Sequence, residues 1–351
     1  MTTYVYYPRG LATGGPEALH QLVDSLRRQG QEAFLVPVPG TESTPRAERY
    51  AHYDAPEAPA VVDAAGNSVV VPETQALLLR PLEHAAPFVW WLSIDYAPRF
   101  VIERAQRSTL PLEQTRMSRP PLLWLRHLKR MWRGWRTGED AVLQRAGHLV
   151  QSHYAWNHIF AHLGRVGTIL SDYTPVGVGS DGAGAAASAV SVEGRVPRIT
   201  YNPAKSAAIM REFSRRYPEL ELLPLRGMTG EEVAEALRTS LIYLDLGTHP
   251  GKDRMPREAA AMGSVVLVAR RGAAANDVDV PLPFAHKVAV LPDVVEAAHD
   301  AVLGVMADPD AALAAQAPYR ERVLNEREVF DAEVAAAFIR GEFGRDGAAE
   351  I

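Results

Sequence analysis

An apolar segment, residues 241–246, is followed by residue types that could bind an anion. This run contains two cations and a histidine among glycines: Gly247, His249, Gly251, Lys252 and Arg254. Backbone N–H groups in such a loop, and the N-terminus of the helix that it opens, attract negative charge. One turn into that helix, the carboxylate of Glu258 could accept hydrogen bonds from ribose hydroxyls. The spacing predicts a site for a phosphorylated ligand such as a nucleotide.

Simpler explanations exist for the same loop. Asp253 and Pro256 are good residues for starting a helix and need no ligand there. Arg254 and Glu258 stand four residues apart, so they could form an ordinary ion pair on one helix face. We favour the phosphate site, because the loop holds more glycines and cations than helix capping requires.

Two other places along the chain could approach a ligand. Gly14 and Gly15 follow the first apolar segment, and Pro16 suits the first turn of a helix. Glycines there would let a ligand come close to the backbone, although an ordinary tight turn explains them too. The pattern is not GlyXGlyXXGly, which disfavours a dinucleotide. Asn202 and Lys205 open a later helix, where Lys205 is either a solvated surface lysine or a second cation for the same ligand.

Asp95 and His153 are candidates for acid–base chemistry. Each follows an apolar, strand-like segment, and either could take the proton of an acceptor hydroxyl. A turn carboxylate and a structural histidine are the simpler alternatives. We see no AspXAsp pair after a suitable strand, so we expect no catalytic metal. Backbone amides and Lys205, Lys252 and Arg254 would then stabilise a leaving diphosphate.

The elements that must position these residues alternate between short apolar segments and helical patterns. The first helix is predicted at 16–29. Strand candidates in the first half are 4–7, 33–38, 76–79, 88–93, 148–151 and 167–170. Such alternation predicts parallel strands with helices on both faces, and ligands of these sheets bind beyond the carboxyl ends of the strands.

Length and composition indicate two folded domains. The chain has 351 residues, of which 47% are hydrophobic, and one ordinary core rarely serves so many. We predict an N-terminal acceptor domain at 1–175, a linker or mobile loop at 176–196 and a nucleotide-binding domain at 197–318. The remaining residues, 319–351, contain a helical pattern predicted to pack back on the first domain.

Charge and cysteine content narrow the function classes. The formal net charge is −5, which disfavours nucleic acid as a partner. The chain has no Cys, which excludes disulfides, thiolate metal sites and a Cys nucleophile. We found no signal-like start and no apolar stretch of membrane-spanning length, so we expect a cytoplasmic protein.

Basic residues concentrate in the segment 116–136, which holds seven Arg or Lys and no Asp or Glu. Helical spacing places its Leu, Met and Trp residues on one side and most of the cations elsewhere. A helix of this kind could lie on an anionic membrane surface, on the inner face of the membrane. Equally, it could pack on its own domain with a solvated basic face.

Taken together, the two-domain plan, the glycine pair at 14–15, the 201–205 segment and the ProArgGluAlaAlaAlaMetGly helix resemble GT-B glycosyltransferases. The resemblance is to the glycogen synthase-like and bacterial polysaccharide branch. It implies two Rossmann-like α/β domains facing a cleft, with a C-terminal helix crossing back to the first domain. It also implies that the cations hold a donor diphosphate and that Glu258 binds the ribose. Many members carry a glutamate where this chain has Pro250, so the sugar contact would pass to His249, Gly251 or Lys252.

The expected function is therefore transfer of a sugar from a nucleotide-sugar donor to a hydroxyl of a glycan or lipid-linked acceptor, without a metal or other cofactor. Closure of the two domains would bring donor and acceptor together. Two alternatives share the fold. One is a sugar-nucleotide epimerase, and the other is a non-catalytic nucleotide- or glycan-binding subunit, which the missing first glutamate would suit.

Overall fold

The protein is described from a computed structural model that covers residues 1–97, 125, 128–129, 138–175 and 190–343. The chain forms two compact units. Among the described residues, the first unit comprises 1–97, 125, 128–129, 138–172 and 328–343, and the second comprises 173–175 and 190–327. Most of the basic segment 116–136 and of the predicted linker 176–196 lies outside the described residues. Both interpretations of the basic segment therefore stay predictions.

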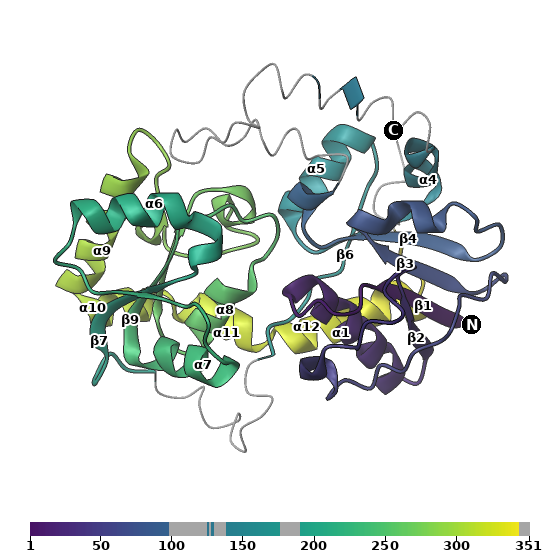
Figure 1. The fold of residues 1–351 in the computed structure, drawn as a ribbon, viewed down its shortest axis with the longest axis horizontal. Helices are drawn as coiled ribbons and strands as arrows, with labels where there is room; N and C mark the ends of the chain where they lie inside the picture. The colour runs from purple at the N-terminus through teal and green to yellow at the C-terminus, as the bar shows by residue number, and fades with distance from the viewer. Residues whose placement is uncertain (98–124, 126–127, 130–137, 176–189, 344–351) are drawn as a thin grey trace. The chain divides into compact units, whose positions relative to one another are not determined.

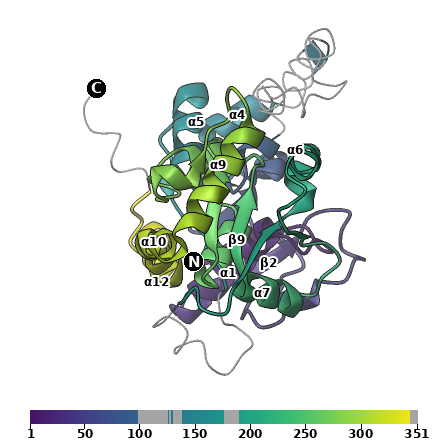
Figure 2. The same cartoon turned by 90° about the vertical axis from the view of Figure 1, so that its left-hand side faces the viewer.

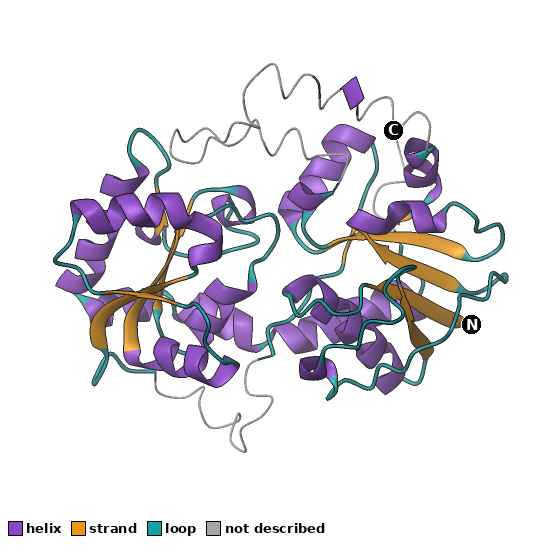
Figure 3. Ribbon diagram, in the orientation of Figure 1, coloured by secondary structure: helices purple, strands orange, loops and turns teal. Residues whose placement is uncertain are grey.

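The first unit contains a six-stranded sheet in the order β2-β1-β3-β4-β5-β6, and every pair in it is parallel. Figure 1 labels β1, β2, β3, β4 and β6 of this sheet. Its strands are β1 (Thr2–Tyr7), β2 (Glu32–Pro37), β3 (Ser68–Pro72), β4 (Ala86–Trp91), β5 (Gly147–Val150) and β6 (Thr168–Ile169). Its helices include α1 (Gly14–Arg28), α4 (Glu139–Arg145) and α5 (His153–Leu163). Short helical turns are η1 (Glu48–Tyr50), η2 (Glu73–Leu79) and η3 (Ile94–Tyr96). Figure 3 shows these strands and helices by colour.

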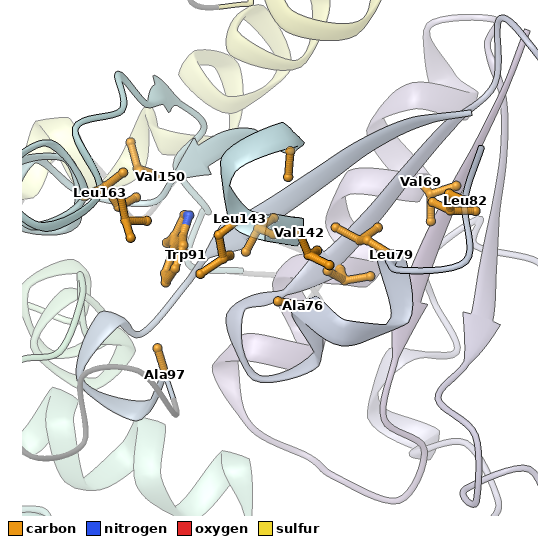
Figure 4. Packing of buried hydrophobic residues seen from close by; sticks show 14 of the residues in the cluster. Val69, Ala76, Leu79, Leu82, Trp91, Ala97, Val142, Leu143, Val150 and Leu163 are labelled. Atoms are coloured by element: carbon orange, nitrogen blue, oxygen red, sulfur yellow. The ribbon is translucent and has the colours of Figure 1, made fainter. Parts of the chain in front are cut away.

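The core of this unit explains why its strands are so apolar. All five residues of β3 are buried, as expected for a parallel strand that is covered on both faces. Figure 4 shows one of its apolar clusters, in which Val69 of β3 and Trp91 of β4 pack with Leu79, Val142 and Leu143. The strands are thereby fixed, and so are the loops that leave their carboxyl ends.

The second unit contains a five-stranded sheet in the order β11-β10-β9-β7-β8, again parallel in every pair. Its strands are β7 (Val196–Tyr201), β8 (Leu222–Pro224), β9 (Ser240–Asp245), β10 (Val265–Ala269) and β11 (Lys287–Val288). Its helices are α6 (Pro203–Arg216), α7 (Gly230–Thr239), α8 (Arg254–Ala261), α9 (Val294–Ala307), α10 (Pro309–Ala315) and α11 (Ala317–Leu324). Two helical turns, η7 (Gly272–Ala275) and η8 (Phe284–His286), follow β10. Figure 2 shows α9, α10 and β9 from another side.

Neighbouring residues of β9 point to opposite faces of this sheet, as the pleat of a strand requires. Ile242 and Leu244 belong to a cluster that includes residues of α6, α9 and α10. Tyr243 belongs to another cluster, with residues of α7, α8 and α11. Helices therefore cover both faces of the sheet, which confirms the predicted α/β class.

The C-terminal helix crosses back to the first unit, as predicted, but only from residue 328 on, because residues 319–327 belong to the second unit. It continues from α11 into α12 (Glu326–Val334) and a π-helical turn, η9 (Ala335–Ile339). The Phe330 ring stacks on Trp90 of β4 with a centroid distance of 6.3 Å, and the Asp331 carboxylate lies 2.8 Å from the Arg28 guanidinium of α1. Ser171 donates its backbone N–H to Glu333 at 2.7 Å. Residues far apart in the chain thus complete one core.

One predicted strand is wrong. Residues 76–79 form the end of η2, and the strand beside them is β3. Leu79 is fully buried while Leu77 is exposed, so this short apolar run has one buried side, as a helical turn does. Periodicity cannot distinguish a strand from a helical turn over so few residues. Within the described part of the chain, no helix has both the length and the apolar character needed to cross a membrane.

Candidate functional site

Adjacent strand ends bring the predicted phosphate-binding residues together in the second unit. Strands β7 and β9 are neighbours, so the loops after their carboxyl ends lie side by side. The Asn202 side chain caps α6 by accepting a hydrogen bond from the Ala204 N–H at 3.0 Å. The backbone departs from helical geometry at Ser206, one residue after Lys205. The cap and this irregularity fix the position of the Lys205 backbone in the first turn of α6.

Gly247 allows the loop after β9 to approach α6 closely. A Cβ at this position would lie 2.8 Å from the Lys205 Cβ and 3.0 Å from an Asp245 carboxylate oxygen. On the opposite side, Gly272 has a φ of +55°, and a Cβ there would lie 1.9 Å from the His249 carbonyl oxygen. Both positions therefore require glycine for steric reasons, with or without a ligand.

Three side chains form a charged network in this loop. The Asp253 carboxylate lies 2.5 Å from the Lys205 ammonium and 2.9 Å from Nδ1 of His249. Asp253 occupies the N-cap position of α8, yet its side chain makes no capping hydrogen bond. Asp253 is therefore the N-cap residue, as the simpler explanation expects, but its carboxylate is directed to the cation and the imidazole.

Asp245 extends this network from the last residue of β9. It is 2% exposed and accepts hydrogen bonds from the Gly247 N–H at 2.9 Å and the Tyr243 hydroxyl at 3.3 Å. The nearest approach between its carboxylate and the His249 imidazole is 3.9 Å. Sequence analysis did not single out Asp245. A carboxylate at the end of an apolar strand was the available signal.

The electrostatics of the network favour an ionised Asp253. Burial opposes its ionisation, but the charge of Lys205 and the hydrogen bond from His249 outweigh it and hold the pKa of Asp253 below its usual value. Burial, together with the nearby Asp245 and Asp253 carboxylates, raises the pKa of the Tyr243 hydroxyl well above its usual value. Tyr243 therefore stays a neutral donor to Asp245.

Arg254 and Glu258 form the ion pair that their spacing allows. The Arg254 Nε and a Glu258 carboxylate oxygen are 3.0 Å apart, and both side chains are partly exposed. This contact fits the simpler explanation of the pair, and it leaves the roles predicted for them untested. A ligand that uses Glu258 for ribose hydroxyls would share it with Arg254.

Arg257 braces the loop from inside, a role that sequence analysis missed. Its guanidinium is buried and pairs with Glu326 at 2.8 Å. It also donates to the Lys252 carbonyl at 2.8 Å and to the Asp253 carbonyl at 3.2 Å. Buried guanidinium groups need several such partners. Arg257 therefore fixes the backbone that carries Lys252 and Asp253.

Gly251 and Lys252 are both buried in this loop. A cavity of about 10 Å³ lies beneath it, lined partly by His249, Lys252, Asp253 and Arg257. A volume of this size holds no more than about one water molecule. The cavity therefore belongs to the packing beneath the loop, and a nucleotide would have to bind elsewhere.

Asp245, His249 and Asp253 can each offer one ligand atom, and these atoms lie within 4.8 Å of one another. Such a set is of a type that can hold a divalent cation. Lys205 already places its ammonium 2.5 Å from Asp253, and a metal ion would have to compete with that positive charge. We therefore interpret the set as a network of ion pairs and hydrogen bonds without a metal ion. Metal independence stays a prediction.

In the first unit, Gly14 and Gly15 form the start of α1. A Cβ at Gly14 would meet no atom within 4 Å, and one at Gly15 would make only an ordinary 3.9 Å contact with Leu92. Packing within this unit therefore does not demand glycine at either position. Close approach by a ligand remains a predicted reason for them.

Asp95 lies in η3, after β4, and is 4% exposed. Its carboxylate accepts a hydrogen bond from the Tyr154 hydroxyl at 3.0 Å. The buried Glu73 carboxylate accepts the backbone N–H groups of Leu92 and Ser93 at 3.1 and 3.2 Å, which holds the turn before Asp95. Asp95 is thus firmly positioned, and its role as a base stays a prediction.

His153 begins α5, directly after the N-cap residue Ser152, and is half-buried. Strands β4 and β5 are neighbours, so the segments that carry Asp95 and His153 leave the same edge of the sheet. Tyr154, next to His153, connects the two by its bond to Asp95. The structure thus places both predicted bases at one sheet edge of the first unit.

No protein-family model and no curated protein matches this chain. Solved structures do. A sucrose-phosphate synthase from Thermosynechococcus elongatus matches with a TM-score of 0.58 at 12% identity, over 97% of this chain and 99% of that one. WaaG, a glycosyltransferase involved in lipopolysaccharide biosynthesis, matches with a TM-score of 0.56 at 9% identity, over 95% and 99%. The catalytic domain of starch synthase IV from Arabidopsis thaliana, bound to ADP and acarbose, gives 0.51 at 8%, over 95% and 99%.

These similarities extend over nearly the full length of the chain, including both sheets. They confirm the predicted fold, which is the two-domain GT-B fold of these glycosyltransferases. Fold alone does not fix a reaction, because one fold can carry several functions. The reaction must be argued from the site.

Proposed function

We propose that this protein is a glycosyltransferase that moves a sugar from a nucleoside diphosphate donor to a hydroxyl of a glycan or lipid-linked acceptor. The observation that carries the proposal is the contact between Lys205, which follows β7, and Asp253 in the loop after β9. Strands β7 and β9 are neighbours in a GT-B fold, so the contact lies at adjacent strand ends. Ligands of parallel sheets bind at this edge. Cations and a helix N-terminus at the same edge suit a diphosphate.

Each donor-binding residue has a proposed task. Lys205, Lys252 and Arg254 neutralise the diphosphate as the bond to the sugar breaks, and Glu258 accepts from the ribose hydroxyls. We assign the sugar contact to His249, Gly251 or Lys252, since position 250 carries a proline in place of a glutamate. This assignment needs no metal ion, because the cations and backbone amides supply the electrostatic stabilisation.

The acceptor side is proposed to use Asp95 as the general base, with His153 as the alternative. The hydrogen bond from Tyr154 to Asp95 supports Asp95, because it orients the carboxylate that would take the hydroxyl proton.

We propose a cytoplasmic location. For a lipid-linked acceptor we add contact between residues 116–136 and an anionic membrane surface.

Two other functions use the same donor site. A sugar-nucleotide epimerase would release a changed sugar without an acceptor. A non-catalytic subunit would bind nucleotide or glycan without turnover, and Pro250 at the place of a glutamate is the observation that favours it. Product analysis separates all three readings.

The test incubates the purified protein with a panel of nucleotide-sugars and measures released nucleoside diphosphate, epimerised donor and bound ligand. We expect release of a nucleoside diphosphate that rises with an acceptor, and weaker donor binding by about tenfold or more for Lys205→Ala, because a direct ion pair to phosphate is lost. Arg215→Ala, at the far end of α6, is the matched control. If no nucleotide-sugar binds or turns over, the proposal is wrong.

A further inference from the structure

Asp253 is a carboxylate inside a site that we assign to an anion, and this conflict needs an explanation. We propose that Asp253 forms an ion pair with the Lys205 ammonium in the free protein and so competes with the diphosphate for this cation. The competition weakens binding of the diphosphate and speeds release of the nucleoside diphosphate product. The inference rests on the proposed function, in which Lys205 binds that diphosphate. Asp253 is then an affinity-setting residue of the donor site.

The first support is where the Asp253 side chain points. A carboxylate at a helix N-cap usually accepts hydrogen bonds from the first turn, but this one makes none. Its carboxylate is 2.5 Å from the Lys205 ammonium. Helix α8 therefore has no side-chain cap at Asp253. The carboxylate instead forms an ion pair with a cation on another helix, α6.

The second support is that His249 can keep Asp253 in place after Lys205 leaves it. Nδ1 of His249 lies 2.9 Å from the Asp253 carboxylate, and His249 is 1% exposed. The Lys205 side chain is 26% exposed and that of His249 is 2% exposed, so Lys205 is the partner of Asp253 that lies closer to solvent. If Lys205 moves from Asp253 to a diphosphate, a buried residue such as His249 must keep Asp253 in place, and the cation must lie closer to solvent.

The third support is the charge of the surrounding cations. Arg254 has a carboxylate, Glu258, at 3.0 Å, and Arg257 has Glu326 at 2.8 Å. These two arginines are thus compensated by carboxylates of the chain itself. A diphosphate that reaches Lys205 comes close to the Asp253 charge, and repulsion at such distances is strong where little water screens it.

The test compares Asp253→Asn with the wild type. Asn keeps the shape and an acceptor for His249 but removes the charge. We expect the variant to bind the best-bound member of a panel of ADP, UDP, GDP, CDP and TDP about tenfold more tightly. Binding of the matching unphosphorylated nucleoside should not change. The variant should also release this diphosphate more slowly than the wild type.

Glu212→Gln is the matched control, because it removes one negative charge from the far end of α6, the helix that carries Lys205. Glu212 pairs there with Arg215 and Arg216, so its removal should change nucleotide affinity less than twofold. If the Asp253→Asn variant yields too little folded protein, Asp253→Ser takes its place in the test, because it removes the same charge with a smaller polar side chain. It must shift the affinity in the same direction.

Unchanged or weaker diphosphate binding by the charge-removing variants, in a protein whose wild type needs Lys205, would overturn the inference and leave the proposed function standing. Equal binding of the diphosphate by the wild type and by Lys205→Met would instead show that Lys205 is not its ligand. In that case the donor site of the proposed function fails first. The two failures are thus distinguishable.

Discussion

At the scale of single residues, Glu258 offers the sharpest test of the donor site. If its carboxylate accepts from ribose hydroxyls, the protein should bind a nucleoside diphosphate about tenfold more tightly than the 2′,3′-dideoxy form, since hydrogen bonds to a charged group are worth about 1.5–3 kcal/mol. Glu258→Ala should abolish this preference. Titration calorimetry with both ligands measures it.

The ratio of the two affinities matters more than either affinity alone. Removing Glu258 also removes its ion pair with Arg254, whose Nε lies 3.0 Å from it, and the loss of this carboxylate would strengthen diphosphate binding. That change affects both ligands equally and cancels in the ratio. A preference for the ribose form that survives in Glu258→Ala would show that another group reads the hydroxyls.

Single residues also show how far the sequence leads. Lys205 and the loop after β9 could be placed together, because both follow strands of one parallel sheet. The contacts that govern their charge could not be predicted. Asp253 pairs with Lys205 and Arg257 with Glu326, and both pairs join separate elements of the chain. Such pairings depend on side-chain directions that residue spacing does not specify.

At the scale of elements, Glu73 connects the start of η2 to the end of β4. Its buried carboxylate accepts two backbone N–H groups there, and burial raises its pKa from 4.5 to about 6. The folded chain therefore holds the Glu73 proton more tightly than the unfolded chain. The stabilising contribution is complete below pH 4.5 and is lost as the pH rises through 6.

We expect the wild type to lose roughly 2 kcal/mol of stability, relative to Glu73→Gln, between pH 4.5 and 7. Gln does not titrate, so other groups cancel in the difference between the two proteins. Chemical unfolding of the first unit, followed by tryptophan fluorescence at both pH values, measures it. Parallel stability changes in the two proteins would rule out a raised pKa at this carboxyl.

A long periodic segment was assigned correctly and one short apolar run was not, although other short strands, such as β6, lie where they were predicted. The periodic segment predicted at 16–29 is α1 at Gly14–Arg28. The apolar run 76–79 was assigned the wrong class, because four residues fit a strand and a helical turn equally well. The valines of β3 carried the better strand signal, since β-branched residues favour strands.

At the scale of the whole chain, the return of the C-terminal segment links stability of the first unit to residues that follow the second unit in the sequence. Phe330 is fully buried and stacks on Trp90, and Asp331 pairs with Arg28. The first unit therefore completes its core only after the second unit has been made. The order of strands in the sheet gives no hint of this dependence.

Phe330→Ala should destabilise the first unit by about 3–5 kcal/mol, the usual cost of removing a buried aromatic ring. Trp90 should respond as well, because its stacking partner is lost and its emission should shift toward that of a more hydrated indole. Val329→Ala is the control, since Val329 is 50% exposed on the same helix and such exposed positions change stability by about 0.5 kcal/mol or less. Equal effects of the two substitutions would mean that α12 does not complete the core of the first unit. A large loss confined to Phe330→Ala would mean that the first unit depends on α12 for its stability, although Asp95 and His153 lie on other elements.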